Sequence, residues 1–174
     1  MSIKPRVAVA ALSVSAAALL ALLGEEGFRS KPYIPTQGDV PTIGYGSTVY
    51  EDGSKVSLAD PPITKERALQ IVRDHKSKDE AMFRASLPGV KLTKGEYDLY
   101  MDFTYQFGIT NWRGSSMRTH LLQGEYVQAC NALPAWRKQG GRDCSLPQNW
   151  GPKGCKGVWT RQLERQAKCL GEQS

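Results

Sequence analysis

Several familiar catalytic motifs are missing from this chain. It has only two histidines, His75 and His120, and it contains no Gly-x-Ser-x-Gly nucleophile elbow, no His-Glu-x-x-His pair and no phosphate-binding loop. His75 lies in a charged helical stretch and His120 on a short predicted helix, so both are interpreted as surface or capping residues. These absences exclude the serine hydrolases with an elbow motif, the common zinc proteases and the P-loop enzymes.

Charge of one sign never accumulates along the chain. No block of five like charges occurs, which excludes a dedicated nucleic-acid-binding arm, and we expect no nucleic-acid partner. The 174 residues include 23 basic and 17 acidic ones, a net charge of +6 at pH 7. This balance favours anionic partners, such as acidic lipid headgroups or an anionic cell-wall polymer. The length suits one domain with a real core, and we expect a monomer.

Cysteine is absent from the first two thirds of the chain. Its four cysteines are Cys130, Cys144, Cys155 and Cys169. The chain begins with an apolar run, Val7 to Leu23, of the kind found in export signals. An even number of cysteines in an exported chain predicts two disulfides in an oxidising compartment, with free structural thiols as the alternative. We favour Cys144–Cys155, which closes a Gly/Pro-rich loop, and Cys130–Cys169, which joins two predicted helices. The spacing does not match a zinc site and no histidine lies nearby, so we expect no metal.

The N-terminal segment carries an uncharged run of 17 residues, Val7 to Leu23, rich in Ala and Leu. Lys4 and Arg6 precede the run and Glu26 follows it, the polarity of an export signal. As one helix the run would span about 25 Å, against a hydrocarbon core of about 30 Å. We therefore expect residues 1–24 to be a weak inner-membrane anchor that is not cleaved. It later leaves the membrane together with the domain of residues 25–174, so that the whole chain enters the periplasm.

Two alternatives stay open for this segment. One is a cleaved signal peptide, although its best small-x-small site, Ala16-Ala17-Ala18, lies inside the apolar run. The other is an ordinary buried helix of a cytosolic protein. The basic flank and the cysteines favour the anchor over both.

The rest of the chain predicts an α+β fold, mainly helical, with a small antiparallel sheet lobe, a long connecting helix and a helical lobe. Helix signals run from Leu20 to Ser30 and end at Pro32. The predicted strands are Thr42–Tyr45, Thr48–Tyr50 and Lys55–Leu58, the last two joined by an Asp52-Gly53 turn. The predicted helices are 64–86, capped by Thr64, the helix after the Thr93–Glu96 capping box, 116–123, 126–133 and 159–169. A cleft between two such lobes suits an extended ligand.

Carboxylate chemistry is what the sequence leaves available. Glycoside hydrolysis needs a protonated acid beside the glycosidic oxygen and a second group on the opposite face of the sugar. Burial against apolar surface supplies the raised pKa that such an acid requires. Glu26 lies between the apolar run and Phe28. The alternative is that Glu25 and Glu26 form a solvated charge pair.

A longer pattern carries a resemblance. The stretch Glu26-Gly27-Phe28-Arg29 … Tyr33 … Gly38 … Thr42-Ile43-Gly44-Tyr45-Gly46 resembles the active-site signature of phage-type lysozymes, the muramidase endolysins of glycoside hydrolase family 24. Phe103–Gly108, Leu133–Trp136 with Gly140-Gly141, and Arg161–Arg165 resemble the helical lobe of that family, so the likeness covers about residues 20–172. The apolar start resembles the signal-arrest-release segments of some members. The resemblance implies hydrolysis of the β-1,4 bond between N-acetylmuramic acid and N-acetylglucosamine in peptidoglycan, with inversion and without a cofactor or metal.

By this resemblance Glu26 is the general acid and Thr42 helps to position the attacking water. The family expects an Asp or Cys in the intervening loop, and here that position falls on Pro35 or Thr36, depending on whether it is counted from the first or the second half of the motif. Asp39 is the only carboxylate in the loop. Either Asp39 substitutes for the missing group, which we favour, or Thr36 and Thr42 hold the water through their hydroxyls.

Further roles follow from the same resemblance. Tyr105 and Gln106 are candidates for binding sugar at the cleft wall, with core packing as the alternative for Tyr105, and Trp136 is expected in the core. The expected partners are peptidoglycan and, transiently through residues 7–23, the inner membrane. Two rival functions are a non-catalytic wall-binding module and a membrane-disrupting basic protein. The amphipathic helix 158–170 could serve the latter, but its apolar face is more simply interpreted as core.

Overall fold

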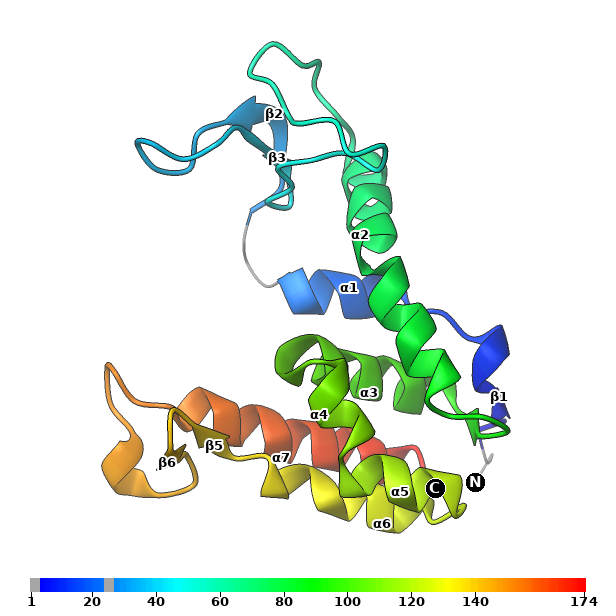
Figure 1. The fold of residues 1–174 in the computed structure, drawn as a ribbon. Helices are drawn as coiled ribbons and strands as arrows, with labels where there is room; N and C mark the ends of the chain where they lie inside the picture. Colours follow the sequence, from blue (N-terminus) through cyan, green and yellow to red (C-terminus); the bar gives the residue numbers. More distant parts are fainter. Residues whose placement is uncertain (1–3, 24–26) are drawn as a thin grey trace. The chain divides into compact units, whose positions relative to one another are not determined.

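The computed structural model describes residues 4–23 and 27–174, which fold as two compact units (Figure 1). The helical unit comprises Met1–Ser13 and Met82–Ser174, and the hairpin unit comprises Val14–Ala81. The secondary structure is mainly helical with small two-stranded antiparallel sheets, which confirms the predicted α+β class. The predicted boundary between residues 24 and 25 lies outside the described residues and stays a prediction.

The hairpin unit is built around strands β2 (Arg29–Tyr33) and β3 (Thr42–Gly44), which pair antiparallel with an irregular register. An isolated bridge joins Val49 to Lys55 across the Asp52-Gly53 turn. The turn therefore lies where the sequence predicts it, while the two strands expected on either side of it reduce to this single pair.

Strand β2 corrects the prediction of a helix from Leu20 to Ser30. Helix α1 covers Ala16–Leu23, and the chain is already extended by the start of β2. Pro32 has no backbone N–H to continue a helical ladder, whereas a short edge strand tolerates it. The Ser30 carbonyl accepts a hydrogen bond from the Ile63 amide at 2.9 Å. Pairing with distant parts of the chain thus decides the conformation here.

The long connecting helix is α2, Lys65–Ala85, close to the predicted 64–86. Thr64 caps it, since its Oγ1 accepts a hydrogen bond from the Arg67 amide at 3.1 Å. Ala68 and Ile71 are among its buried residues. Residues 65–81 belong to the hairpin unit and residues 82–85 to the helical unit.

The helical unit is organised around α3, Lys94–Phe107. The predicted capping box forms: Thr93 Oγ1 accepts from the Glu96 amide at 3.0 Å, and Glu96 Oε2 accepts from the Thr93 amide at 2.8 Å. Trp112 is fully buried against aromatic rings of this unit and donates its Nε1–H to Ser86 Oγ at 2.8 Å. The other helices are α4 (Ile109–Arg113), α5 (Ser116–Leu122), α6 (Tyr126–Ala132) and α7 (Lys156–Gly171).

Helix α7 contradicts the interpretation of its apolar face as core. The structure leaves Leu163 and Leu170 about two fifths exposed and buries Gln162, Arg165 and Cys169 instead. Arg165 can be buried because its Nε–H donates to Asp102 Oδ2 at 2.7 Å and its guanidinium lies over the Phe103 ring. The inward face of α7 is therefore set by an ion pair and a disulfide.

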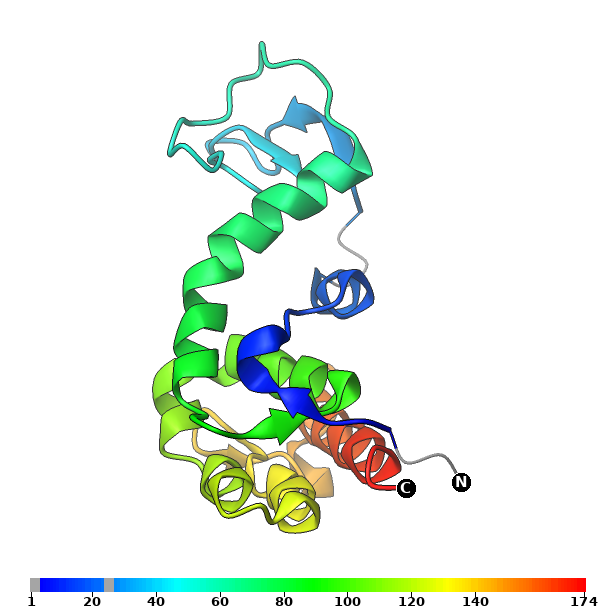
Figure 2. The same cartoon turned by 90° about the vertical axis from the view of Figure 1, so that its right-hand side faces the viewer.

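The apolar N-terminal run is not one helix in this fold. It forms strand β1 (Val7–Ala8), a 3₁₀ turn (Val9–Ala11) and α1. Figure 2 shows β1 in dark blue beside the green strand β4 (Lys91–Leu92), with which it pairs antiparallel. The Val9 amide donates to the Val90 carbonyl at 3.1 Å. These tertiary hydrogen bonds replace the helical ones, and no helix in the described part of the chain is long and apolar enough to cross a membrane.

Both predicted disulfides form, Cys130–Cys169 between α6 and α7 and Cys144–Cys155 across a loop. This is the pairing that the sequence favours. The loop follows strands β5 (Lys138–Gln139) and β6 (Arg142–Asp143) and contains a 3₁₀ turn at Pro147–Asn149. It ends where α7 begins.

Candidate active site

The stretch Thr42–Gly46 forms a tight reversal at the end of β3. Ile43 and Ser47 exchange backbone hydrogen bonds, 2.9 Å from Ile43 N to Ser47 O and 3.0 Å from Ser47 N to Ile43 O. Between them Gly44 and Gly46 have φ values of 66° and 89°, a region that residues with a side chain rarely adopt. The two glycines of the motif are therefore required by the backbone.

Gly44 also allows β3 to approach α2. A Cβ atom added to Gly44 would lie 2.9 Å from Ala68 Cβ, which is closer than two such carbons pack. Beside this contact the rings of Phe28 and Tyr45 lie 5.6 Å apart, and Lys65 Nζ lies 6.0 Å from the centre of the Phe28 ring. The motif is thus held between the hairpin and the first turn of α2.

Thr42 is the best-placed functional group of this stretch. It is buried in β3, opposite Tyr33 of β2. Its Oγ1–H donates to the Val40 carbonyl at 3.1 Å, so the oxygen lone pairs remain available as acceptors. An attacking water must hand its protons to acceptors while its own oxygen faces the sugar carbon. The role of Thr42 in positioning this water stays a prediction.

The loop between β2 and β3 places Thr36 and Asp39 in one turn. The Asp39 amide donates to the Thr36 carbonyl at 2.9 Å, and Gly38 between them has a φ of 94°. Both side chains are exposed. Within the described part of the chain, the Asp39 carboxylate makes no hydrogen bond or ion pair, and neither side chain hydrogen-bonds to Thr42. The carboxylate is free to accept a proton or a hydrogen bond from a ligand.

Glu26, the predicted general acid, and Glu25 lie outside the described residues. The described chain resumes at Gly27 and Phe28, immediately before β2. The role of Glu26 therefore stays a prediction from the sequence.

Tyr105 and Gln106 are located on α3 of the helical unit and are both half-buried. Gln106 Oε1 is shielded from solvent and has no hydrogen-bond partner among the residues the structure describes. Buried polar atoms are nearly always paired, so this acceptor has unused capacity for a donor such as a sugar hydroxyl. Their role in sugar binding stays a prediction.

Two tryptophans of the helical unit differ in their surroundings. Trp136 packs against Phe103 and Phe107 at ring-centroid distances of 5.1 and 5.4 Å but is half-buried, at the edge of the core where the sequence places it inside. Trp150, to which the sequence assigned no role, is 36% exposed in the Cys144–Cys155 loop. The sequence signal that could have singled out Trp150 is its position in a Gly/Pro-rich loop closed by two cysteines.

No group of three His, Cys, Asp or Glu side chains that could hold a metal occurs in residues 4–23 and 27–174. His120 Nδ1 instead lies 2.7 Å from Glu125 Oε2, next to the end of α5. The chemistry of the candidate site consists of one buried hydroxyl, an exposed carboxylate and a second exposed hydroxyl, carried by a glycine-dependent hairpin.

The sequence of this chain, including the hairpin, is similar to that of known proteins. Residues 24–147 match the family model described as phage lysozyme. The chain is 30% identical over 129 residues to the endolysin of Salmonella phage P22, covering 74% of this chain and 86% of that one. It is 30% identical over 133 residues to the endolysin of Bacillus phage PZA, of which it covers 49%.

Solved structures agree with this. A crystal structure of a P22 lysozyme point mutant superimposes with a TM-score of 0.65 at 26% identity, covering 91% of this chain and 99% of that one. An endolysin from Escherichia coli O157:H7 phage FAHEc1 superimposes with a TM-score of 0.62 at 25% identity, covering 92% and 94%. The family match ends at residue 147, inside the Cys144–Cys155 loop.

Proposed function

The chain belongs to the phage lysozyme family, and from that premise we propose that it hydrolyses the β-1,4 bond between N-acetylmuramic acid and N-acetylglucosamine. Membership makes it a glycoside hydrolase that degrades peptidoglycan and so lyses the host cell. The bond that is cut, and the residues that cut it, are our proposal. The observation that carries it is Thr42, whose buried hydroxyl donates to the Val40 carbonyl and so keeps its lone pairs as acceptors.

In the proposed reaction Glu26 donates its proton to the glycosidic oxygen as the bond to the anomeric carbon breaks. A water attacks that carbon from the opposite face, which inverts its configuration. The water is oriented by Thr42 and loses its proton to the Asp39 carboxylate. The alternative arrangement uses the Thr36 hydroxyl in place of Asp39, with the proton passing to solvent. Glu26 gives up one proton, and Asp39 or the solvent takes one from the water, so the hydrolysis needs no cofactor.

A turbidity assay on purified peptidoglycan tests the assignment of Glu26. Glu26→Gln keeps the shape of the side chain but has no proton to give, so clearing is expected to stop while sedimentation with the polymer continues. A non-catalytic wall-binding module would show binding without clearing in the unmodified protein as well. Proton NMR of the wild-type product, taken before mutarotation, is expected to show the α-anomer first, whereas a retained β-anomer contradicts inversion.

We also propose that the N-terminal run first tethers the protein to the inner membrane and then leaves it. Support comes from the way the run is used in the fold: Val9, Val14 and Leu19 are at most 3% exposed. A side chain buried in the protein cannot lie in the lipid at the same time. The tethered and folded states therefore exclude each other, which suits a form held inactive until release.

Fractionation of expressing cells tests the tether. The intact mass is expected first in the membrane fraction and later in the soluble periplasm. A product lacking about the first two dozen residues would support a cleaved signal peptide instead.

A membrane-disrupting role is the second candidate, because α7 exposes Leu163 and Leu170. The Glu26→Gln variant also separates this function from the first. Killing that is unchanged in that variant would favour membrane disruption, and killing that is lost with clearing supports the glycosidase.

A further inference from the structure

The Cys144–Cys155 loop is cross-linked at several points, although it has little regular secondary structure. The disulfide closes it, and the Cys155 amide donates to the Asn149 carbonyl at 2.9 Å. Asn149 Nδ2 donates to the Asp143 carbonyl at 2.8 Å, and Trp150 Nε1 donates to the Cys144 carbonyl at 2.9 Å. Each of these bonds fixes the position of a side chain or of the backbone beside it, so the loop presents a preformed surface.

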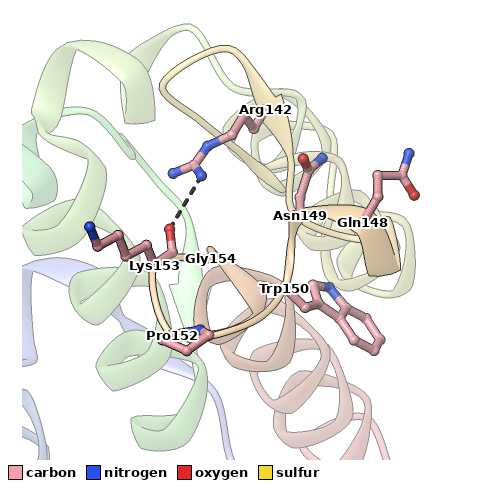
Figure 3. Close-up of a pocket in the computed structure, with 7 residues that line it drawn as sticks. All are labelled: Arg142, Gln148, Asn149, Trp150, Pro152, Lys153 and Gly154. Atoms are coloured by element: carbon pink, nitrogen blue, oxygen red, sulfur yellow. Dashed lines mark hydrogen bonds between the residues drawn. The ribbon is translucent and has the colours of Figure 1, made fainter.

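An open pocket with a volume of about 490 Å³ lies in this loop (Figure 3). Its lining consists of Arg142, Gln148, Asn149, Trp150, Pro152, Lys153 and Gly154. A cation, an amide and an aromatic ring therefore border one hollow. Recognition sites for small polar ligands have this composition, an apolar wall with a few convergent polar groups.

The loop and its flanks are strongly basic. Residues 137–156 contain one acid, Asp143, and five basic residues, which are Arg137, Lys138, Arg142, Lys153 and Lys156. The Asp143 carboxylate is already used, because Ser145 Oγ–H donates to it at 2.6 Å and Arg137 Nε–H at 3.0 Å. These hydrogen bonds, that of Ser145 foremost, lower the pKa of Asp143 to about 2. The remaining cations create a positive field that favours an anionic ligand.

Trp150 adds a flat surface to this field. Its side chain is 36% exposed, and Lys156 Nζ lies 4.6 Å from the centre of a Trp150 ring. Sugars present apolar C–H faces that pack on aromatic rings, and their carboxylates pair with Arg and Lys. The Arg142 guanidinium points into the same loop, where Nη1 donates to the Lys153 carbonyl at 3.3 Å (Figure 3). A saccharide that bears a carboxylate meets both requirements.

We propose that the Cys144–Cys155 loop is a second peptidoglycan-binding site, which takes a carboxylate-bearing saccharide of the intact wall polymer. The proposal rests on the proposed function for the identity of the polymer. The site uses none of the residues assigned to bond cleavage, and residues 148–155 lie beyond the family match. Its effect is to hold the enzyme on an insoluble polymer between successive cuts, so it contributes to cleavage of the intact wall and not to cleavage of short soluble fragments.

Sedimentation with intact sacculi tests the site directly. The full-length protein carries Glu26→Gln so that binding is measured without cleavage. Arg142→Gln with Lys153→Gln is expected to weaken binding about tenfold or more, corresponding to at least about 1.4 kcal/mol. The matched control, Arg161→Gln with Lys168→Gln on α7, removes the same charge from exposed positions outside the pocket and is expected to change binding less than twofold. Equal losses in the two variants would show a diffuse charge effect and overturn the proposal.

A second readout separates this site from the catalytic proposal. In the chain with Glu26 intact, Arg142→Gln with Lys153→Gln is expected to clear sacculi more slowly but to cleave a short soluble wall oligosaccharide at the unmodified rate. Equal slowing on both substrates would overturn the second site. Failure of the catalytic proposal would appear differently, as no cleavage of either substrate by the unmodified protein, and the sedimentation result would still stand. Trp150→Ala, checked for its disulfides by mass spectrometry, is expected to weaken sedimentation as the charge variant does, and unchanged sedimentation would overturn the role of the ring.

Discussion

Arg6 Nη2 lies 2.8 Å from Glu96 Oε1, and this pair fastens the N-terminal arm to the capping box of α3. Glu96 is 1% exposed and also accepts from the Thr93 amide and from Gln173 Nε2, both at 2.8 Å. The Arg6 guanidinium lies 3.8 Å from the centre of the Tyr126 ring. The hydrogen bond to Glu96 raises the pKa of Arg6 above its ordinary value. A residue expected at the cytoplasmic end of a membrane anchor is thus part of the folded helical unit.

Arg6→Ala is expected to destabilise the protein, because it leaves Glu96 buried without its cation. Removing one partner of a largely buried pair is expected to lower the free energy of unfolding by about 2–3 kcal/mol. Urea denaturation followed by circular dichroism measures the change. Lys168→Ala on α7 is the control, with an expected change of about 0.5 kcal/mol or less. Equal values for the two variants would show that the arm is not fastened through Arg6.

Glu172 makes the attachment of the N-terminal arm to the helical unit dependent on pH. Its carboxylate accepts from Lys4 Nζ at 2.5 Å and from Thr93 Oγ1 at 2.6 Å. Burial raises the pKa of Glu172, but these hydrogen bonds outweigh it and leave the pKa below the ordinary value of 4.5. The contribution to stability is therefore complete above about pH 4.5 and is lost as the pH falls through the lower pKa of the folded state.

The measurement is the free energy of unfolding of the wild type and of Glu172→Gln between pH 7 and pH 3. The difference between them is expected to be largest near pH 7 and to shrink below pH 4.5. Glu164→Gln, an exposed change on α7, serves as the control. A difference that stays constant across the range contradicts the assigned role of the Glu172 carboxylate.

Gly44→Ala tests the packing of the motif on α2. The change forces a side chain into a backbone with a φ of 66° and sets its Cβ 2.9 Å from that of Ala68. We expect a loss of about 2–4 kcal/mol in the free energy of unfolding. Gly53→Ala is the matched control, because its φ of 84° is similar but the space around it is open. Its expected loss is about 1–2 kcal/mol, and a Gly44→Ala loss no larger than this would remove the packing argument.

Asp39→Ala decides the identity of the second catalytic group. If the carboxylate takes the proton of the attacking water, clearing of peptidoglycan should fall about a hundredfold or more, while Thr36→Ala stays near the unmodified rate. The opposite pattern supports the hydroxyl arrangement of Thr36 and Thr42. Near-normal activity in Asp39→Ala shows that the carboxylate does not act in the reaction.

The features that the sequence predicted well are those that local chemistry decides. Thr64 and Thr93 cap α2 and α3 through hydrogen bonds within one helical turn, so their signals lie in adjacent residues. The same is true of the turn at Asp52, whose Oδ1 accepts from the Ser54 amide at 2.9 Å. The two disulfides follow because loop closure and helix pairing leave few sensible partners for four cysteines.

The features that were predicted wrongly depend on distant partners. Strand β2 exists because β3 and Ile63 pair with it, and β1 exists because β4 does. The inward face of α7 is set by Arg165 and Asp102, which no periodicity of apolar residues reveals. In the candidate site, the motif located Thr42, but only the fold shows that its hydroxyl donates to the Val40 carbonyl.

Mass spectrometry of the digested wall tests the central claim most directly. Purified peptidoglycan is incubated with the wild type or with Glu26→Gln, and the soluble products are reduced with borohydride. The wild type is expected to release fragments that end in reduced N-acetylmuramic acid, and the variant is expected to release none. Fragments that end in reduced N-acetylglucosamine, cleavage within the peptides, or the same products from Glu26→Gln would contradict a muramidase that uses Glu26 as its acid.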